Sequence, residues 1–416
     1  MELYHVGKQK GKGISRYQIE LKDAHNLARN GLMTLSISVG MKVLEAMIYE
    51  EVDEIAGIKG KHINNKNVYR HGTEATSVVL GGQKAKIEKP RLRSKAGKEV
   101  SIETLNQFQS EDALNTRILK QILAGIKTRD YGGFQDASPD LDTFGTSKSS
   151  VSRRFIQETT KGMQEFVNRP LEDDTYPIMM FDGVGIGDYL VIVALGIKTN
   201  GEKRILGIRE GSSESSEVCK SLISDIIERG IDANIPRLFV LDGSKALSKA
   251  VKETFNKAHI QRCQLHKKRN VEGHLPDSEK ARIINEMNAA YAEFEYKEAK
   301  LKLEKLAKSL DYKYPSAADS IREGLDETLT LHKLKIPGLL RISLASTNPI
   351  ESAIGTIRQI TVRVKRWRNG QQVLRWLSCG FLTAEKQFRK IKGYKLLPTL
   401  TQILDGREVS ENEIAI

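Results

Sequence analysis

Residues 176–198 read YPIMMFDGVGIGDYLVIVALGIK and contain the strand pattern that decides the fold. A short apolar run ends in an acid at Asp182, and a longer, nearly continuous apolar run occupies 188–198. The residues TNG at 199–201 suit a tight turn, and KRILGIRE at 203–210 returns from it as a third strand. The stretch therefore predicts a three-stranded meander.

The segments that follow alternate between helix and strand. SSESSEVCKSLISDIIERG at 212–230 has the apolar face and the terminal glycine of an amphipathic helix. RLFVLDG at 237–243 reads as a buried strand, a helix is expected at 245–257, and HIQRCQLH at 259–266 reads as a fifth strand. A meander followed by alternation predicts an α/β fold with a mixed sheet covered by helices, in the order β-β-β-α-β-α-β.

Two of these strands end in near copies, MMFDG and FVLDG. If the first and fourth strands are neighbours, Asp182 and Asp242 emerge side by side at one edge of the sheet, and the glycine after each acid leaves room for a substrate or a metal. The alternative is that each Asp simply opens a turn. Converging carboxylates are the oxygen ligands that two-metal phosphoryl transfer requires.

A third acid lies in STNPIES at 346–352. The pattern predicts a helix with Asn348 as N-cap, Pro349 as first residue and Glu351 at the third position, which is a capping-box arrangement. Capping alone would explain the glutamate. The functional alternative places Glu351 in the first helical turn, facing the sheet edge as a third ligand.

The N-terminal part combines helices with one hairpin. Residues 18–56 are expected to be helical, and 76–93 form a hairpin with a turn at Gly81-Gly82. Seven basic residues and one acidic residue lie between positions 84 and 98. An isolated hairpin is marginally stable, so this one must pack on neighbours or on a ligand.

Further helices are expected on both sides of the sheet. Residues 110–170 look helical, and TFGTSKSSVSRRF at 143–155 is typical either of a helix-turn-helix recognition helix or of any capped surface helix. Residues 278–335 carry many Lys-Glu pairs and predict an all-helical insertion. Residues 349–391 predict one or more basic helices, and SENEIAI at the end a frayed tail.

Composition narrows the class of protein. The 416 residues are enough for roughly two to four domains. The net charge of +13 favours a polyanionic partner, nucleic acid first. No apolar run approaches the ~20 residues of a membrane span, and the N-terminus MELYHVGKQKGKG lacks the apolar core of a secretory signal. We therefore expect a cytosolic protein.

The cysteines argue against disulfide and zinc chemistry. Cys219, Cys263 and Cys379 are far apart and odd in number. Cys263 and His266 lack a second pair of ligands at zinc spacing, so Cys263 is interpreted as a small buried residue of the fifth strand.

At this point the motifs match a known family. HIQRCQLHKKRN at 259–270 resembles the Q-R-C-x-x-H-x-x-R-N signature of the Mutator-type bacterial insertion-sequence transposases, and STNPIES resembles their T-N-x-I-E-S motif. GTSKSSVSRRF at 145–155 resembles the helix-turn-helix that precedes their catalytic domain. The resemblance covers roughly residues 60–395. Two departures are Ile354, where the family usually has Asn, and GVGIGDYL after the first acid, which lacks the expected aromatic and basic residues.

The resemblance implies a ribonuclease H-like catalytic domain interrupted by a helical insertion, for which the interval between Asp242 and Glu351 leaves room. It implies Asp182, Asp242 and Glu351 as catalytic ligands of two Mg²⁺ ions, with Mn²⁺ able to replace them. It also implies cleavage and strand transfer at terminal inverted repeats, into target DNA, by a homodimer or higher oligomer in the bacterial cytoplasm, associated with the nucleoid.

Basic residues in several segments are candidates for contact with double-stranded DNA through its phosphates. His266 is either a phosphate contact or part of a helix start with solvated charges, and Trp367 is either a stacking residue or part of the core. The candidates are Lys84, Lys86, Arg91, Arg93, Lys148, Ser149, Arg153, Arg154, Arg262, His266, Arg269, Arg363, Lys365, Arg366, Trp367 and Arg368.

The predicted organisation has six parts. An N-terminal helical region (1–60) and a DNA-binding region with hairpin and helix-turn-helix (61–170) precede the catalytic core. The core occupies 171–271 and 341–395, the helical insertion 272–340, and a C-terminal tail 396–416. Two other functions fit the same residues: a ribonuclease H-like nuclease without strand transfer, and a catalytically silent DNA-binding protein derived from a transposase.

Overall fold

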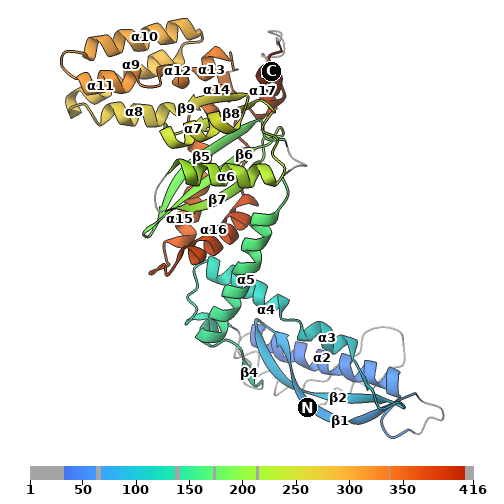
Figure 1. Ribbon diagram of the computed structural model, residues 1–416. Coiled ribbons are helices and arrows are strands. Elements are labelled where there is room, and N and C mark those ends of the chain that lie inside the picture. The colour runs from blue at the N-terminus through green and yellow to red at the C-terminus, as the bar shows by residue number, and fades with distance from the viewer. Residues whose placement is uncertain are drawn as a thin grey trace, which may run out of the picture. The chain divides into compact units, whose positions relative to one another are not determined.

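The structure is a computed structural model and describes residues 32–61, 67–135, 141–171, 175–211, 215–336 and 338–407. The chain divides into two compact units, Met1–Glu158 and Thr159–Ile416. Figure 1 shows a helix-and-hairpin assembly in the first unit and a sheet with many helices in the second. In the described ranges no helix is long and apolar enough to cross a membrane.

The first unit is built on the predicted hairpin. Strands β1 (Val68–Leu80) and β2 (Gln83–Ser94) pair antiparallel, with Leu80 opposite Gln83 across a two-glycine turn at positive φ. The short strands β3 (Glu99–Val100) and β4 (Thr143–Phe144) pair with β2. The turn and the alternation predicted for the hairpin are confirmed.

Helix α2 (Leu32–Ala56) supplies the neighbour that the hairpin needs. Its buried side chains, among them Leu44 and Ile48, share a core with Val78, Ala85 and Ile87 of the hairpin. The helix predicted at 18–56 is thus confirmed from residue 32, and positions 18–31 lie outside the described residues.

The predicted helix-turn-helix is not formed with a tight turn. Helices α3 (Glu103–Gln109) and α4 (Asp112–Leu123) are followed by η1 (Tyr131–Phe134), by β4 and then by α5 (Lys148–Asn168). Residues 124–147 separate α4 from α5, far more than the 3–4-residue turn of that motif. The Ser147 hydroxyl accepts a hydrogen bond from Ser150 N, so the alternative of a capped helix describes the start of α5, which is 21 residues long.

The second unit contains the predicted mixed sheet. Its strand order is β7-β6-β5-β8-β9. Strands β5, β6 and β7 form the antiparallel meander, and β8 and β9 run parallel to β5. The strands are β5 (Ile178–Ile186), β6 (Tyr189–Ile197), β7 (Lys203–Gly211), β8 (Arg237–Leu241) and β9 (Ala258–Arg262).

Helices cover both faces of this sheet because successive strand residues point to opposite sides. On one face Met179 and Phe181 pack with α6 (Ser216–Glu228) and α7 (Lys245–Thr254). On the other, Ile178 and Met180 pack with α15 (Asn348–Thr361) and α16 (Gly370–Glu385). The mixed α/β class and the predicted element order are confirmed.

Two strand boundaries differ from the prediction. Strand β5 does not end at Asp182 but continues to Ile186, because its second half pairs with β6 as far as Tyr189. The fifth strand ends at Arg262 rather than at position 266, and α8 (Gln264–Glu272) begins directly after Cys263.

The region between β9 and the last helices is all helical, as predicted. Helices α9 (Asp277–Ala292), α10 (Tyr296–Leu310), α11 (Pro315–Arg322), α12 (Leu325–Thr328) and α13 (Thr330–Lys333) follow α8. This insertion has its own core, which includes Met287, Leu303 and Ile321. The fully buried Lys267 of α8 donates to the Glu323 carbonyl oxygen at 2.7 Å, which ties α8 to the end of α11.

The C-terminal part returns to the sheet. It contains α14 (Gly338–Leu344), α15, α16, η2 (Tyr394–Leu396) and α17 (Leu397–Leu404). The predicted tail at 396–416 is therefore wrong for its first half: Leu397, Leu400 and Leu404 are buried in the core beside the sheet. SENEIAI lies outside the described residues.

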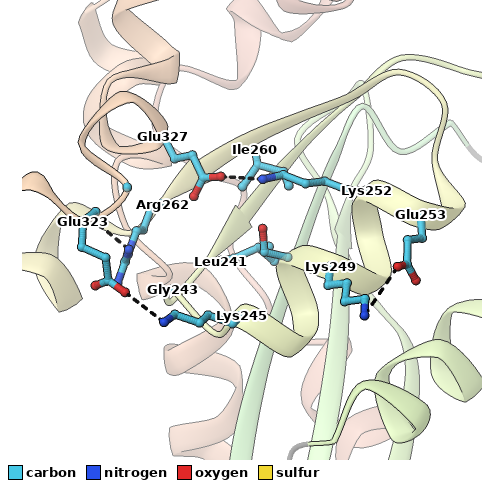
Figure 2. A pocket seen from close by; sticks show the side chains of 12 residues that line it. Leu241, Gly243, Lys245, Lys249, Lys252, Glu253, Ile260, Arg262, Glu323 and Glu327 are labelled. Carbon is cyan, nitrogen blue, oxygen red and sulfur yellow. Dashed lines mark hydrogen bonds and ion pairs between the residues drawn. The ribbon is translucent and has the colours of Figure 1, made fainter.

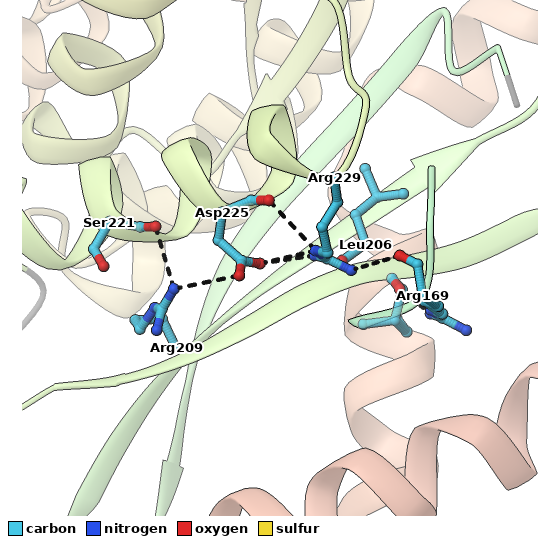
Figure 3. A network of polar contacts seen from close by, with 7 residues as sticks. Arg169, Leu206, Arg209, Ser221, Asp225 and Arg229 are labelled. Carbon is cyan, nitrogen blue, oxygen red and sulfur yellow. Dashed lines mark hydrogen bonds and ion pairs between the residues drawn. The ribbon is translucent and has the colours of Figure 1, made fainter. Parts of the chain in front are cut away.

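A polar network connects strand β7 with helix α6, which covers one face of the sheet (Figure 3). The Arg229 guanidinium donates to Asp225 Oδ2 at 2.8 Å and also to the Leu206 carbonyl oxygen. Arg209 donates to the Ser221 carbonyl oxygen at 3.3 Å and lies 3.7 Å from Asp225. Because the charges are paired, this cluster is structural.

Candidate active site

Strand register brings the two predicted aspartates to neighbouring positions. In the parallel pair of β5 and β8, Phe181 lies opposite Leu241, and the next residues are Asp182 and Asp242. Strand β8 ends at Leu241, so Asp242 leaves the sheet where Asp182 remains on β5. The near-identical motifs thus reach the same edge of the sheet, as the sequence predicted.

Local backbone groups hold both carboxylates. Gly183 N donates to Asp182 Oδ1 at 2.9 Å, and Ser244 N donates to Asp242 Oδ1 at 2.9 Å. The Ser244 hydroxyl in turn accepts from Leu247 N and caps α7. The loop after β8 is therefore fixed at its carboxylate and at the start of the next helix.

Gly243 has a different role from the one predicted. Its φ is +109°, and a Cβ there would lie 2.5 Å from Arg262 Nε. The absent side chain makes room for a buried arginine of β9 rather than for a substrate.

Glu351 occupies the first turn of α15, and the residue that caps the helix is Thr347, not Asn348. Thr347 is fully buried, and its hydroxyl donates to Glu351 Oε1 at 3.0 Å. The predicted capping box is therefore wrong: Thr347 makes no side-chain cap hydrogen bond, and Glu351 is the fourth residue of the helix. The threonine before the Asn-Pro pair was the signal that could have placed the helix start correctly.

Thr347 also connects Glu351 to the motif after β9. Its Oγ1 lies 3.3 Å from His266 Nδ1 and 3.5 Å from Cys263 Sγ. A hydroxyl has one proton, and an ionised carboxylate is its strongest acceptor. The chain of hydrogen bonds therefore runs from His266 Nδ1–H to Thr347 and on to Glu351.

Cys263 is buried, as predicted, but it caps α8 instead of lying within β9. Its Sγ accepts from His266 N and from Thr347 N, each at 3.4 Å. Cys263 N donates to the Leu241 carbonyl oxygen at 2.7 Å. The cysteine thus joins the end of β8 to the start of α15.

Electrostatics show that the three acids share one region. Burial, and next the charge of Asp242, raise the pKa of Asp182 to about 6, and Glu351 adds to the same effect. The pKa of His266 is also raised, first by its hydrogen bond with Cys263 and then by the nearby Glu351 and Asp242 charges. The three carboxylates and His266 therefore interact electrostatically at this edge of the sheet.

The acids form an electrostatic cluster rather than a closed cage. In the part of the chain that the structure describes, no three His, Cys, Asp or Glu side chains are grouped closely enough to hold a metal ion. His266 Nε2 lies 3.8 Å from Glu351 Oε1.

The basic residues of the hairpin are largely paired with acids. Lys84 pairs with Glu111, and Lys86 lies 2.6 Å from Asp142. Arg91 lies 3.4 Å from Glu99, and Arg93 is half-buried. The positive run in the sequence is therefore largely neutralised on this surface.

Helix α5 presents Lys148, Ser149 and Arg153 to solvent, whereas Arg154 is half-buried and pairs with Glu111. The hydrogen bond from Arg154, and next that from Lys84, lower the pKa of Glu111 to about 2. Partial burial acts in the opposite direction but is a smaller effect.

Arg262 is not placed for the predicted phosphate contact. It is buried, donates to the Glu323 carbonyl oxygen at 3.1 Å, and lies 2.9 Å from the Glu323 carboxylate. Arg269 is exposed on α8.

The last group of candidates lies on the loop between α15 and α16, where Arg363, Lys365, Arg366 and Arg368 are exposed. Trp367 is half-buried: its ring centroid lies 6.2 Å from that of Trp376 in an edge-on arrangement, and it packs against the sheet core. This geometry favours the predicted core alternative for Trp367.

Comparisons with known proteins give one consistent family. The model of the family described as Transposase, Mutator family, matches residues 16–390. A transposase for insertion sequence element IS6120 of Mycolicibacterium smegmatis is 31% identical over 246 residues, 57% of this chain and 73% of that protein. A transposase for ISRM5 of Rhizobium meliloti (strain 1021) is 27% identical over 356 residues, 83% of this chain and 85% of that protein. A transposase for IS256 in transposon Tn4001 of Staphylococcus aureus is 24% identical over 333 residues, 76% and 80% of the two chains.

Proposed function

The chain belongs to the Mutator family of transposases, and from this premise we propose that it binds the terminal inverted repeats of an insertion sequence, cleaves DNA there and transfers the freed strand to target DNA. The observation that carries the proposal is that Asp182, Asp242 and Glu351 lie near one another at one edge of the sheet. They are close enough that the charges of Asp242 and Glu351 both raise the pKa of Asp182. The proposed reaction class is phosphoryl transfer of the DDE type.

We further propose that the second unit has the ribonuclease H-like fold. The support is its topology: the first strand of the meander lies at the centre of the sheet, between an antiparallel pair on one side and two parallel strands on the other. The helical insertion between β9 and α15 fits the same proposal.

The donor set at this edge suits Mg²⁺, with Mn²⁺ able to replace it. All three acids offer oxygen, which hard cations prefer. Burial, and next the charge of Asp242, raise the pKa of Asp182, and a bound cation would offset both effects on its charged form. Two such ions, held by Asp182, Asp242 and Glu351, would lower the pKa of an attacking water or 3′-hydroxyl and neutralise charge on the phosphoryl group.

Other groups of the protein orient the three acids and would stabilise the bound DNA strand. Gly183 N and Ser244 N fix the orientations of the two aspartates. The Thr347 hydroxyl holds Glu351. His266 lies beside it, and a phosphate oxygen of the bound strand would favour the protonated ring further, since its pKa is already raised, first by the hydrogen bond with Cys263. Pre-organised groups of this kind need little rearrangement during the reaction.

Exposed basic residues of α5, α8 and the loop between α15 and α16 are proposed to hold DNA through its phosphates. Two element ends must be brought together for strand transfer, so we propose a homodimer or higher oligomer on DNA, acting at the bacterial nucleoid.

The test is cleavage of a duplex that carries the inverted repeat bracketing the gene. Asp182→Asn, Asp242→Asn and Glu351→Gln should each reduce Mg²⁺-dependent cleavage by at least about 10³-fold, the scale seen when one essential member of a catalytic group is removed, while binding of the duplex persists. Retention of cleavage by all three variants would refute the assigned triad.

A joint-molecule assay with the wild-type protein separates transposition from simple hydrolysis. Products in which the cut 3′ end is joined to target DNA are expected. Cut ends that never join would identify a nuclease, and binding without cleavage under any metal condition would identify a silent DNA-binding protein.

A further inference from the structure

A pocket of about 500 Å³ opens beside Asp242. Leu241 and Gly243, the residues on either side of that aspartate, line it together with one face of α7 and the Glu323–Glu327 segment of the insertion. Figure 2 shows Lys245 and Lys252 of α7 directed toward Glu323 and Glu327 of the insertion across this space, whereas Lys249 is directed toward Glu253 of the same helix.

One side of the pocket is a basic stripe. Lys245, Ser248, Lys249 and Lys252 occur at helical spacing on α7, while Leu247, Ala250 and Val251 on the opposite face are buried in the core. At 1.5 Å per residue the stripe extends about 10 Å along the helix axis. The stripe begins three residues after Asp242, at the N-terminus of α7, where the helix dipole also favours an anion.

The lysines have partners that are easily exchanged. Lys252 lies 2.7 Å from Glu327, Lys249 3.9 Å from Glu253, and Lys245 3.8 Å from Glu323. The Lys245 side chain is 91% exposed. Exposed pairs of this kind contribute only about 0–1 kcal/mol, so an anion with several charges can displace the carboxylates at small cost.

A DNA strand has the right charge distribution for this site. Its phosphates are spaced about 3.4 Å per strand along the duplex axis, so the stripe covers about three of them, and release of condensed counterions drives the exchange. Asp242 does not line the pocket itself, but its chain neighbours Leu241 and Gly243 do. A strand whose scissile phosphate reaches Asp242 can therefore continue along α7, which carries the positive charge.

We propose that the groove between α7 and the insertion binds the phosphodiester backbone of the DNA strand that flanks the cleavage site, with Lys245, Lys249 and Lys252 as its contacts. The strand displaces Glu327 from Lys252, whereas Glu323 stays paired with the buried Arg262 when Lys245 turns to a phosphate. The inference rests on the proposed function, because it names the path of the same DNA substrate. It adds a contact surface that lies outside every basic segment marked by the sequence.

The experiment measures binding of the full-length protein to the element-end duplex by fluorescence anisotropy over a range of KCl concentrations. Each of Lys245→Ala, Lys249→Ala and Lys252→Ala should reduce the slope of log affinity against log salt by about 0.9. Glu327→Gln should increase affinity severalfold, because it frees Lys252. A purely structural ion pair would not give opposite effects from its two partners.

Lys305→Ala is the matched control, since Lys305 is an exposed lysine of α10 that makes no ion pair with any other described residue. If the α7 variants bind as Lys305→Ala does while the wild-type protein binds and cleaves the duplex, the groove is refuted and the proposed function stands. If the wild-type protein neither binds nor cleaves the duplex, the proposed function itself fails, and the groove with it.

Discussion

Asp182 at the sheet edge and Glu111 beside the hairpin are both carboxyl groups among charged neighbours, but their environments act in opposite directions. Burial and like charges raise the pKa of Asp182 to about 6, whereas the Arg154 hydrogen bond, and next that of Lys84, lower the pKa of Glu111 to about 2. Glu111 has basic partners, and its ion pairs stabilise the fold. Asp182 is buried beside other carboxylates instead, so its negative charge remains available for a ligand. This difference separates structural from functional acids in this protein.

Outside the triad itself, the largest expected effect on DNA cleavage comes from removing the Thr347 hydroxyl, the uncharged donor that bonds to Glu351 at the sheet edge. Thr347→Val preserves the shape of a fully buried side chain but removes the hydrogen bond to Glu351. Loss of a group that orients a ligand typically costs about 10–100-fold in metal affinity or activity. We expect DNA cleavage to fall by that factor, with a higher Mg²⁺ concentration needed for half-maximal rate.

Thr347→Ser is the control, because it retains the hydroxyl that links His266 to Glu351. It should keep most of the activity and the Mg²⁺ dependence of the wild type. Equal losses in both variants would mean that any change of this buried side chain disturbs the site, and orientation of Glu351 by the hydroxyl would be refuted as the cause.

The second effect concerns stability without metal. Since the native pKa of Asp182 is raised, its contribution to stability is fully present below the unfolded pKa near 4 and is lost as pH rises through about 6. Asp182→Asn should therefore stabilise the second unit at pH 8 by about 3 kcal/mol and have little effect at pH 4.

Tryptophan fluorescence measures this effect selectively, because the two tryptophans of the chain, Trp367 and Trp376, both lie in the second unit. Unfolding is followed with a chelator present. An Asn variant that is less stable than the wild type at pH 8 would mean that Asp182 is compensated after all, and the comparison with Glu111 would collapse.

Sequence patterns predicted the sheet well because burial on a strand repeats every second residue and leaves a visible apolar run. The same reasoning ended the first strand at Asp182 and missed the second half of β5, which only the pairing with β6 reveals. The ribonuclease H-like identity of the sheet stays a prediction.

The site was predictable in part. The DG repeats indicated where two acids meet, because parallel neighbours end at one edge. Thr347 was missed because the Asn-Pro pair suggested a helix start one residue later, and a bond from its hydroxyl to Glu351 cannot be seen in the sequence. Arg262 was predicted as a DNA contact because local sequence cannot show that Glu323, far along the chain, lies beside it.

The third effect has the opposite sign of pH dependence. The lowered pKa of Glu111 means that its stabilisation is present above the unfolded pKa near 4.5 and is lost as pH falls through about 2. Its side chain is 40% exposed, so screening reduces the contribution to about 1 kcal/mol. Glu111→Gln should destabilise the first unit at pH 7, and the difference should shrink as pH falls below 4, as measured by far-UV circular dichroism.

The same variant should leave the tryptophan transition of the second unit in place. A loss of stability that is independent of pH would show that Gln at 111 disturbs packing. The Arg154 and Lys84 pairs would then contribute nothing measurable.

The smallest effect tests whether compensation also predicts DNA contact. Lys365 is exposed and makes no ion pair with another described residue, whereas the Arg154 side chain is only 14% exposed and pairs with Glu111. In salt titrations of duplex binding, Lys365→Ala should lower the slope of log affinity against log salt by about 0.9. Arg154→Gln should lower that slope by less than half as much, because a guanidinium held in a half-buried pair is not exchanged for a phosphate. Equal reductions for the two variants would show that DNA displaces Glu111 as well, so that a half-buried ion pair does not separate structural from functional charge.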